Sequence, residues 1–203
     1  MEARLAMWNI LERHVPAPSV AYCYDLWERY QFDFVVTRPR HTRLGDFTAK
    51  PNQRERITVN NNLNPYNFLI TYLHEIAHLE VYRSYKRRQP PHGKAWKTHF
   101  RALLLPTLNE QTFPASILSP LTLYSHNPTA STGTFLPLMQ AIKNVDAPHS
   151  DLVMVSELSE GQAFRLQQKV FIRGTQRRTR IVCIEKTSQK KYLVAAHAWV
   201  ERL

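Results

Sequence analysis

Two histidines and a glutamate stand at the spacing of a metal-dependent hydrolase: His74, Glu75 and His78. On a helix, residues i and i+4 lie one above the other, so the two imidazoles can bind one tetrahedral Zn²⁺. Glu75 then lies beside the metal rather than on it, where a general base is needed. The same pattern also fits two ordinary hydrogen-bonded histidines with a solvated glutamate. The surrounding segments decide between these interpretations.

The residues before the motif predict a helix that begins at Pro65. Asn64 suits the N-cap, and proline is favoured at the first helical position because that N–H has no partner in the helix. Apolar residues then recur every three or four positions, as on a buried helix face: Phe68, Leu69, Tyr72, Leu73, Ile76, Leu79 and Tyr82. Basic residues 83–88 suit the C-terminal end, and Pro90-Pro91 ends the helix. The motif is therefore expected in mid-helix, where buried ionisable groups need a partner such as a metal.

A catalytic zinc site also needs a third protein ligand and an open position for water. His92 follows the Pro90-Pro91 turn, and residues 94–100 resume a helical pattern. We expect His92 to return beneath the first helix as the third ligand, with Gly93 leaving room for close backbone approach. His99 is the reserve ligand. The other histidines, at positions 14, 41, 126, 149 and 197, show no such spacing and are expected to be structural or solvated.

The combination of His-Glu-x-x-His with a downstream His-Gly-x-x-Trp resembles the SprT/Spartan group of zinc metalloproteases. The matching residues are His74, Glu75, His78, His92, Gly93 and Trp96, and the likeness covers about residues 1–105. It implies a zincin-like protease domain, a three-histidine zinc site and, in some members, action on proteins bound to DNA. Many members carry a zinc ribbon of paired cysteines after this domain. This chain has 2 cysteines, Cys23 and Cys183, so a four-cysteine site is impossible.

Length and composition indicate a folded chain of one large domain, or of a domain with a small appendage. The chain has 203 residues, of which 43% are hydrophobic and 11% aromatic. It contains no long apolar run, so we expect no membrane span and no signal peptide, and a cytoplasmic protein. The two distant cysteines are expected to be free thiols, with one long-range disulfide as the alternative.

Positive charge is concentrated in three segments. The net charge is +11, and the basic residues cluster in residues 37–56, 81–101 and 161–191, whereas residues 102–160 are acidic. Such a distribution is typical of a polyanion-binding protein, and we expect non-sequence-specific binding to nucleic acid. The alternative is a solvated surface charge. Several interleaved aromatic residues either stack on unpaired bases or belong to the core: Tyr82, Tyr85, Trp96, Phe171 and Tyr192.

The order of the elements predicts an α+β fold. Residues 1–105 are expected to form the protease domain, with helices at 4–13 and 20–30 and a small antiparallel sheet from strands at 32–37, 44–48 and 56–59. The proline-rich residues 106–160 predict short helices joined by turns. Residues 161–203 alternate as strands do, at 164–172, 178–184 and 192–200, and predict a basic β-meander in place of the zinc ribbon. The expected nucleic-acid contacts of this unit are Arg177, Arg178, Arg180, Lys190 and Lys191.

Taken together, the residues favour a zinc endopeptidase that cleaves a protein substrate at or near nucleic acid. One catalytic Zn²⁺ would lower the pKa of its bound water toward ~7, and Glu75 would accept the water's proton. The alternative is a non-proteolytic nucleic-acid-binding or transcription-associated factor whose zinc is structural. The number of protein ligands distinguishes them, because a catalytic site has three and a structural site has four.

Overall fold

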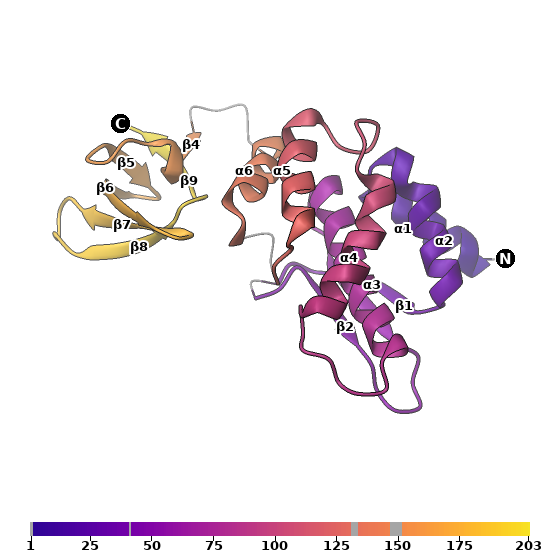
Figure 1. Cartoon of the computed structure of the whole chain (residues 1–203). Helices are drawn as coiled ribbons and strands as arrows, with labels where there is room; N and C mark the ends of the chain where they lie inside the picture. Colours follow the sequence, from indigo (N-terminus) through magenta and orange to yellow (C-terminus); the bar gives the residue numbers. More distant parts are fainter. Residues whose placement is uncertain (1, 41, 131–133, 147–151) are drawn as a thin grey trace. The chain divides into compact units, whose positions relative to one another are not determined.

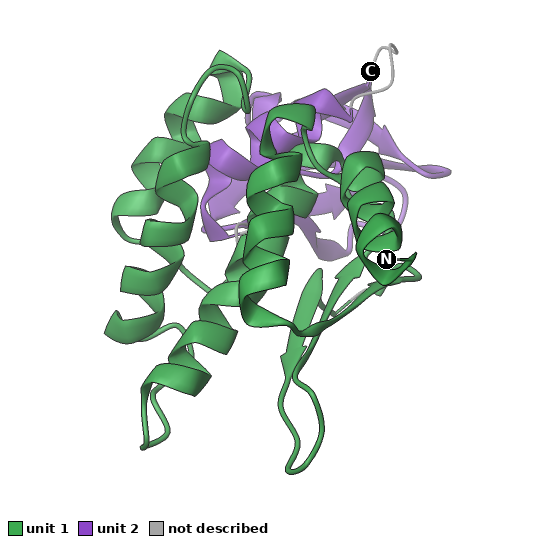
Figure 2. Ribbon diagram, turned by 90° about the vertical axis from the view of Figure 1, so that its right-hand side faces the viewer, with its two compact units in different colours: residues 1–130 green, residues 131–203 purple. Residues whose placement is uncertain are grey.

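The computed structural model describes residues 2–40, 42–130, 134–146 and 152–203. These residues form a mixed α+β structure, as expected. The chain divides into two compact units, Met1–Ala130 and Ser131–Leu203 (Figures 1 and 2). The boundaries expected at 105/106 and 160/161 are replaced by one at 130/131. Residues 106–130 belong to unit 1 because Phe113 packs on Tyr66 and Tyr124 packs on Phe100.

Unit 1 contains the helices α1 (Glu2–His14), α2 (Val20–Tyr30), α3 (Pro65–Ser84), α4 (Lys94–Leu104) and α5 (Ala115–His126). The bounds of α2 match the expected residues 20–30, and α3 begins at Pro65 as expected. Its C-terminus comes earlier than the proline pair, at Ser84, and residues 85–93 form a loop. That loop leads into α4, which packs against α3.

The sheet of unit 1 is mixed rather than antiparallel. It consists of β1 (Asp33–Thr37), β2 (Gly45–Thr48) and β3 (Arg56–Asn60) in the order β1-β3-β2. The hairpin partners β2 and β3 are antiparallel, whereas β1 and β3 are parallel. Ile57 and Val59 of β3 are fully buried, so the most buried strand lies at the centre and pairs on both sides. Alternation along a strand does not report this pairing order, which is why the expected antiparallel sheet was wrong.

Helix α3 is the central element of unit 1. It packs against β2 and β3 and against α1 and α4 (Figure 1). Two hydrogen bonds tie the helices together: the Tyr72 hydroxyl donates to the Cys23 carbonyl over 2.9 Å, and the Tyr22 hydroxyl donates to the Leu103 carbonyl over 2.9 Å. Because both bonds end on backbone carbonyls, they fix the register of α2 against α3 and α4. The helix that carries His74 and His78 is thus held on several sides.

Unit 2 contains α6 (Leu136–Val145) and the strands β4 (Leu152–Met154), β5 (Ala163–Leu166), β6 (Lys169–Arg177), β7 (Arg180–Glu185), β8 (Lys191–Ala195) and β9 (Trp199–Arg202). With α5, helix α6 confirms the short helices expected in residues 106–160. The sheet order is β4-β9-β5-β6-β7-β8.

The expected meander is only partly correct. Strands β5 to β8 do follow one another, but β9 returns to pair between β4 and β5. The expected strand at 164–172 is two strands that turn at Gln167, whose φ is +58°, and the expected strand at 192–200 is also two. Gly174 lies within β6 where the register with β7 shifts. Short turns and bulges break these strands, but the alternation of apolar residues continues across them. The pattern therefore predicted one strand where the structure has two.

The two cysteines are free thiols, and each lies in the core of its own unit. Cys23 of α2 and Cys183 of β7 both have a relative exposure of 0%. Cys183 belongs to the apolar core of unit 2, together with Phe164, Phe171 and Val200. The expected free thiols are confirmed. No helix in the described part of the chain has the length and apolar character that crossing a membrane requires.

Candidate metal centre

The motif helix begins as its sequence predicts. The Asn64 side chain accepts a hydrogen bond from the Asn67 N–H over 2.9 Å, which caps the helix, and Pro65 occupies the first turn. From this start, positions 74 and 78 lie one turn apart on the same face. The cap therefore sets the start of the helix, and the packing of α3 sets the direction in which both imidazoles point.

His92 reaches the same point from a different element. The Gly93 N–H donates to the Pro90 carbonyl over 3.0 Å, so Pro90 to Gly93 form a β-turn. His92 occupies its third position with a φ of +58°, and Pro91 precedes it, which is the arrangement of a type II turn. Glycine or asparagine is usual at this position because a Cβ is crowded there. The turn places the His92 ring against the rings of His74 and His78.

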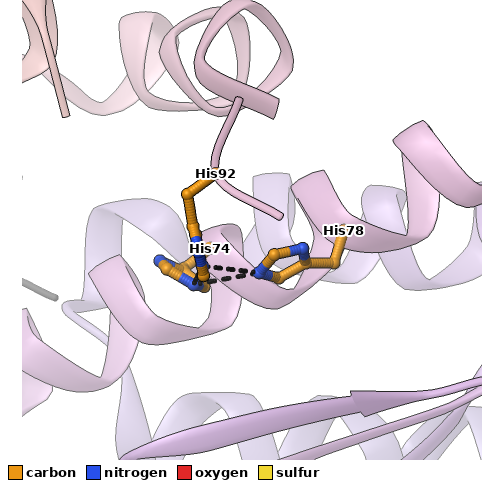
Figure 3. Close-up of side chains that lie close together, drawn as sticks. All are labelled: His74, His78 and His92. Carbon is orange, nitrogen blue, oxygen red and sulfur yellow. Dashed lines mark hydrogen bonds between the residues drawn. The ribbon is translucent and has the colours of Figure 1, made fainter. Parts of the chain in front are cut away.

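The three imidazole rings converge (Figure 3). Their Nε2 atoms are separated by 3.1 Å between His74 and His92, 3.2 Å between His74 and His78, and 3.0 Å between His78 and His92. Two nitrogens on one tetrahedral zinc, each about 2.0–2.1 Å from it, are about 3.3 Å apart. The three distances are close to this value. The structure thus brings together the three residues expected to bind the metal.

Protonation alone cannot satisfy this triangle of nitrogens. Each Nε2 carries either a proton or a lone pair, so at least two of the three are alike and repel each other at these distances. A cation between them removes the conflict, because all three lone pairs can then point at it. The donor set therefore fits a bound metal better than it fits a hydrogen-bonded histidine cluster.

The local environment keeps the imidazoles neutral, as metal ligands must be. Burial lowers the pKa of His74 well below its ordinary value, and His78 and His92 lower it further. Burial, followed by the effect of His92, lowers the pKa of His78 to about 4. Burial also lowers the pKa of His92. All three rings are thus available as ligands at neutral pH.

Trp96 forms one wall of the cluster. Its ring centroid lies 4.6 Å from that of His74, 5.6 Å from His78 and 4.7 Å from His92. Its indole N–H donates to the His74 carbonyl over 3.3 Å, and its relative exposure is 1%. Of the two roles considered for this aromatic residue, the structure supports the core and not the stacking of bases. The His-Gly-x-x-Trp spacing is explained, because Trp96 fixes the orientation of the rings.

Glu75 points from α3 toward the edge strand of the sheet. A Cβ added to Gly45 of β2 would lie 2.6 Å from Glu75 Oε1 and 2.7 Å from Thr71 Cγ2, so only glycine fits there. Glu75 also accepts a hydrogen bond from the Phe47 N–H. Burial and the Asp46 carboxylate raise the pKa of Glu75 to about 8, against the opposing effects of Arg40, the Phe47 N–H and Arg43.

Asp46 is a site residue that the sequence did not reveal. Its carboxylate raises the pKa of both Glu75 and His78, so it lies close enough to act on both side chains electrostatically. It is held by Arg43 Nη1 at 2.7 Å and by the Thr48 hydroxyl at 3.2 Å. Neither Gly45 nor Asp46 has a spacing relation to the motif helix. The one available signal was the single glycine in a predicted strand, which often marks close backbone approach.

His99, the reserve ligand, lies outside the cluster. Its Nδ1 is 2.7 Å from Glu80 Oε2, and the other oxygen of Glu80 accepts a hydrogen bond from the Tyr30 hydroxyl. His99 thus joins α4 to α3 and α2. Of the other histidines, His14 stacks on Phe68 with a centroid distance of 4.8 Å, and burial lowers the pKa of His197 to about 4. His126 is exposed, and His41 and His149 lie outside the described residues.

The five expected nucleic-acid contacts of unit 2 fall into two groups. Arg177, Arg178 and Arg180 surround the turn between β6 and β7, where Arg177 pairs with Arg180. Lys190 and Lys191 lie at the other end of the β7–β8 hairpin, where Lys191 pairs with Ile184. Arg180 is paired with Ala195. Since each strand residue advances about 3.3 Å, the groups are separated by about 13 Å along β7.

Comparisons with protein-family models, with curated proteins and with solved structures find no match for this chain. The functional assignment therefore depends on the geometry and chemistry of the site.

Proposed function

We propose that the chain is a zinc-dependent endopeptidase of the SprT-like, zincin-like type. The observation that carries this proposal is the convergence of three neutral imidazole nitrogens within 3.0–3.2 Å, beside a glutamate that is not one of them. Imidazole ligands at tetrahedral distances suit Zn²⁺, although they also bind other transition metals. When bound, zinc would supply a nucleophile from water at neutral pH and polarise the scissile carbonyl.

Glu75 is the proposed proton acceptor. In the metal-free protein its pKa of about 8 keeps it mostly protonated at neutral pH. A dication nearby favours the carboxylate, so the base would be formed in the loaded enzyme. Glu75 would take the proton of the attacking water and deliver it to the leaving amine. Trp96 holds the imidazole rings in place and excludes water from one side of the site.

The edge strand β2 is the proposed binding surface for the substrate. It ends the order β1-β3-β2, so backbone groups on its outer edge are not paired within the sheet. An extended peptide can pair with such an edge, and Gly45, Asp46 and Phe47 would lie along it. Glu75 contacts the same strand. A peptide bound there would therefore pass close to the proposed base.

The alternative function, a nucleic-acid-binding factor with a structural zinc, requires a fourth protein ligand. Within the described residues the metal-binding group consists of His74, His78 and His92, with no further histidine, cysteine, aspartate or glutamate. His99 is engaged by Glu80. This donor set favours an open position, and thus catalysis. We retain nucleic acid as a proposed partner of the protease because of the segmental basic charge.

The variant Glu75→Gln tests this proposal. We expect it to keep about one zinc per chain and to lose peptide hydrolysis by a factor of about 10²–10⁴, the usual contribution of a general base. Metal is measured by elemental analysis and cleavage by fluorescence from a quenched unstructured protein. Glu80→Gln is the matched control on the same helix and should retain cleavage. Full activity of Glu75→Gln would show that Glu75 is not the base.

A further inference from the structure

A second feature of unit 1 lies next to the metal cluster. An open pocket of about 320 Å³ is lined by His92, Gly93, Lys94, Lys97, Thr98, Arg101 and His126. Four of these side chains other than His92 are basic: the cationic Lys94, Lys97 and Arg101, and the imidazole of His126. They come from two elements, three from α4 and His126 from the end of α5. His92 belongs to both the pocket and the metal cluster.

The cations of α4 form a line. Lys94, Lys97 and Arg101 are separated by three and four residues, so they share one face of the helix. At about 1.5 Å per residue, the line is about 10 Å long. No described carboxylate forms an ion pair with any of the three. Lys97 donates to the Asn127 side-chain oxygen over 2.5 Å, which directs its amine toward the C-terminal end of α5.

The charge continues on the other side of His92. The loop between α3 and α4 carries Lys86, Arg87 and Arg88, all exposed, and the chain has no acidic residue from position 81 to position 109. One or two cations are enough to bind a single carboxylate. The loop and one face of α4 together present six cationic side chains. A continuous row of cations matches a continuous row of anions, which a nucleic-acid backbone supplies at every nucleotide.

We propose that this pocket binds the phosphodiester backbone of single-stranded nucleic acid directly beside the metal centre. Lys94, Lys97 and Arg101 contact successive phosphates, and the His126 imidazole supplies a further hydrogen-bond donor. The pocket has the volume of a small-ligand site, so it takes a segment of strand rather than a duplex. The inference rests on the proposed function only for the choice of nucleic acid as partner, since binding does not require cleavage.

The test uses the Glu75→Gln full-length protein, so that binding is measured without hydrolysis. Fluorescence anisotropy with a labelled oligothymidylate gives the affinity at several salt concentrations. We expect the further changes Lys94→Gln, Lys97→Gln and Arg101→Gln to weaken binding at least tenfold. Removal of three phosphate contacts should also reduce the log–log salt slope by about 2, at about 0.7 for each contact with a single strand.

The matched control carries Arg177→Gln, Arg178→Gln and Arg180→Gln in unit 2, which removes the same charge. We expect it to weaken binding less than the α4 variant does. Zinc content must equal that of the parent in both variants, which shows that the His92 turn is intact. An affinity of the α4 variant within twofold of the parent overturns the proposal. Equal competition by a poly-glutamate peptide overturns the assignment to nucleic acid, since it would identify the pocket as a carboxylate site.

The outcome of the oligonucleotide-binding test is independent of the outcome of the hydrolysis test. If Glu75→Gln retains hydrolysis while the α4 variant loses oligonucleotide binding, the pocket assignment stands and the assigned base is wrong. If the α4 variant binds normally while Glu75→Gln is inactive, the pocket assignment falls and the peptidase assignment stands.

Discussion

The two units of the chain place their polar chemistry in opposite ways. Unit 1 gathers three half-buried imidazoles and a buried carboxylate at one site, where each contacts the others or the backbone. Unit 2 keeps an apolar interior and carries most of its arginines and lysines on the exterior. Buried polar groups must have partners, so their neighbours are restricted, whereas exposed cations are solvated and tolerate many arrangements. We therefore expect changes in unit 1 to be costly and specific, and charge changes in unit 2 to be mild.

The largest expected effect follows from His74→Ala. Removing one of three imidazole ligands should reduce zinc from about one per chain to nearly none, and peptide hydrolysis should disappear with it. Elemental analysis and the cleavage assay measure both. His99→Ala is the control, because His99 lies outside the cluster, and it should retain zinc. Equal loss of zinc from both variants would show either that His99 also binds the metal or that unit 1 has unfolded, and both results contradict the assigned ligand set.

Gly45→Ala probes the contact between the sheet edge and the motif helix. The new Cβ would lie 2.6 Å from Glu75 Oε1 and 2.7 Å from Thr71 Cγ2, so β2 or the Glu75 side chain must move. We expect a loss of about 1–3 kcal/mol in stability, as for other overpacked sites, together with reduced hydrolysis. Urea unfolding followed by tryptophan fluorescence measures the first. An unchanged midpoint would mean that β2 shifts freely and does not position Glu75.

The stability of the metal-free protein should depend on pH with two opposing limbs, one that rises with pH and one that falls. The folded-state pKa of His78 is about 4, so the unfolded chain binds more protons than the folded chain below pH 6.5, and stability falls as pH decreases. The folded-state pKa of Glu75 is about 8, so its contribution is complete below pH 4.5 and is lost as pH rises through 8. The slope from one group is at most about 1.4 kcal/mol per pH unit. Between pH 4.5 and pH 6.5 the effects of His78 and Glu75 oppose each other, and the lowered pKa values of His74 and His92 add to the effect of His78. We therefore expect maximal stability near pH 6.5.

Glu75→Gln separates the two limbs. Glutamine does not titrate, so this variant should lose the decrease between pH 6.5 and pH 8 and keep the decrease below pH 6.5. Urea unfolding in the presence of a chelator, at half-unit steps of pH, measures both limbs. A decrease above pH 6.5 that persists in the variant would assign that limb to other groups.

The smallest expected effect is that of the helix cap. Asn64→Ala removes the acceptor of the Asn67 N–H and should destabilise unit 1 by about 1 kcal/mol. Asn62→Ala is the matched control, because this exposed neighbour precedes the helix. Urea unfolding again measures the change. Since metal ligands lie further along α3, zinc content should be unchanged, and a loss of zinc would show that the cap also positions the motif.

The success of prediction from the sequence differed between local and distant relations. Asn64, Pro65 and the i, i+4 spacing of His74 and His78 are local signals, and the structure places them as expected. His92 was found because a turn followed by a helix limits where the chain can go. The parallel pairing of β1 with β3 and the return of β9 beside β4 are relations between distant segments, which alternation does not encode. Gly45 and Asp46 were missed for the same reason.

Each unit buries one cysteine, so the rate of thiol modification can report the opening of each unit separately. Cys23 and Cys183 are both fully enclosed, and burial raises the pKa of each thiol, so neither is reactive while its unit remains closed. An alkylating reagent can modify Cys23 only when unit 1 opens, and Cys183 only when unit 2 opens. The two modification rates, read separately by peptide mass, give two opening free energies from one sample of unaltered protein. Zinc should slow the modification of Cys23 and leave that of Cys183 unchanged if the units open independently.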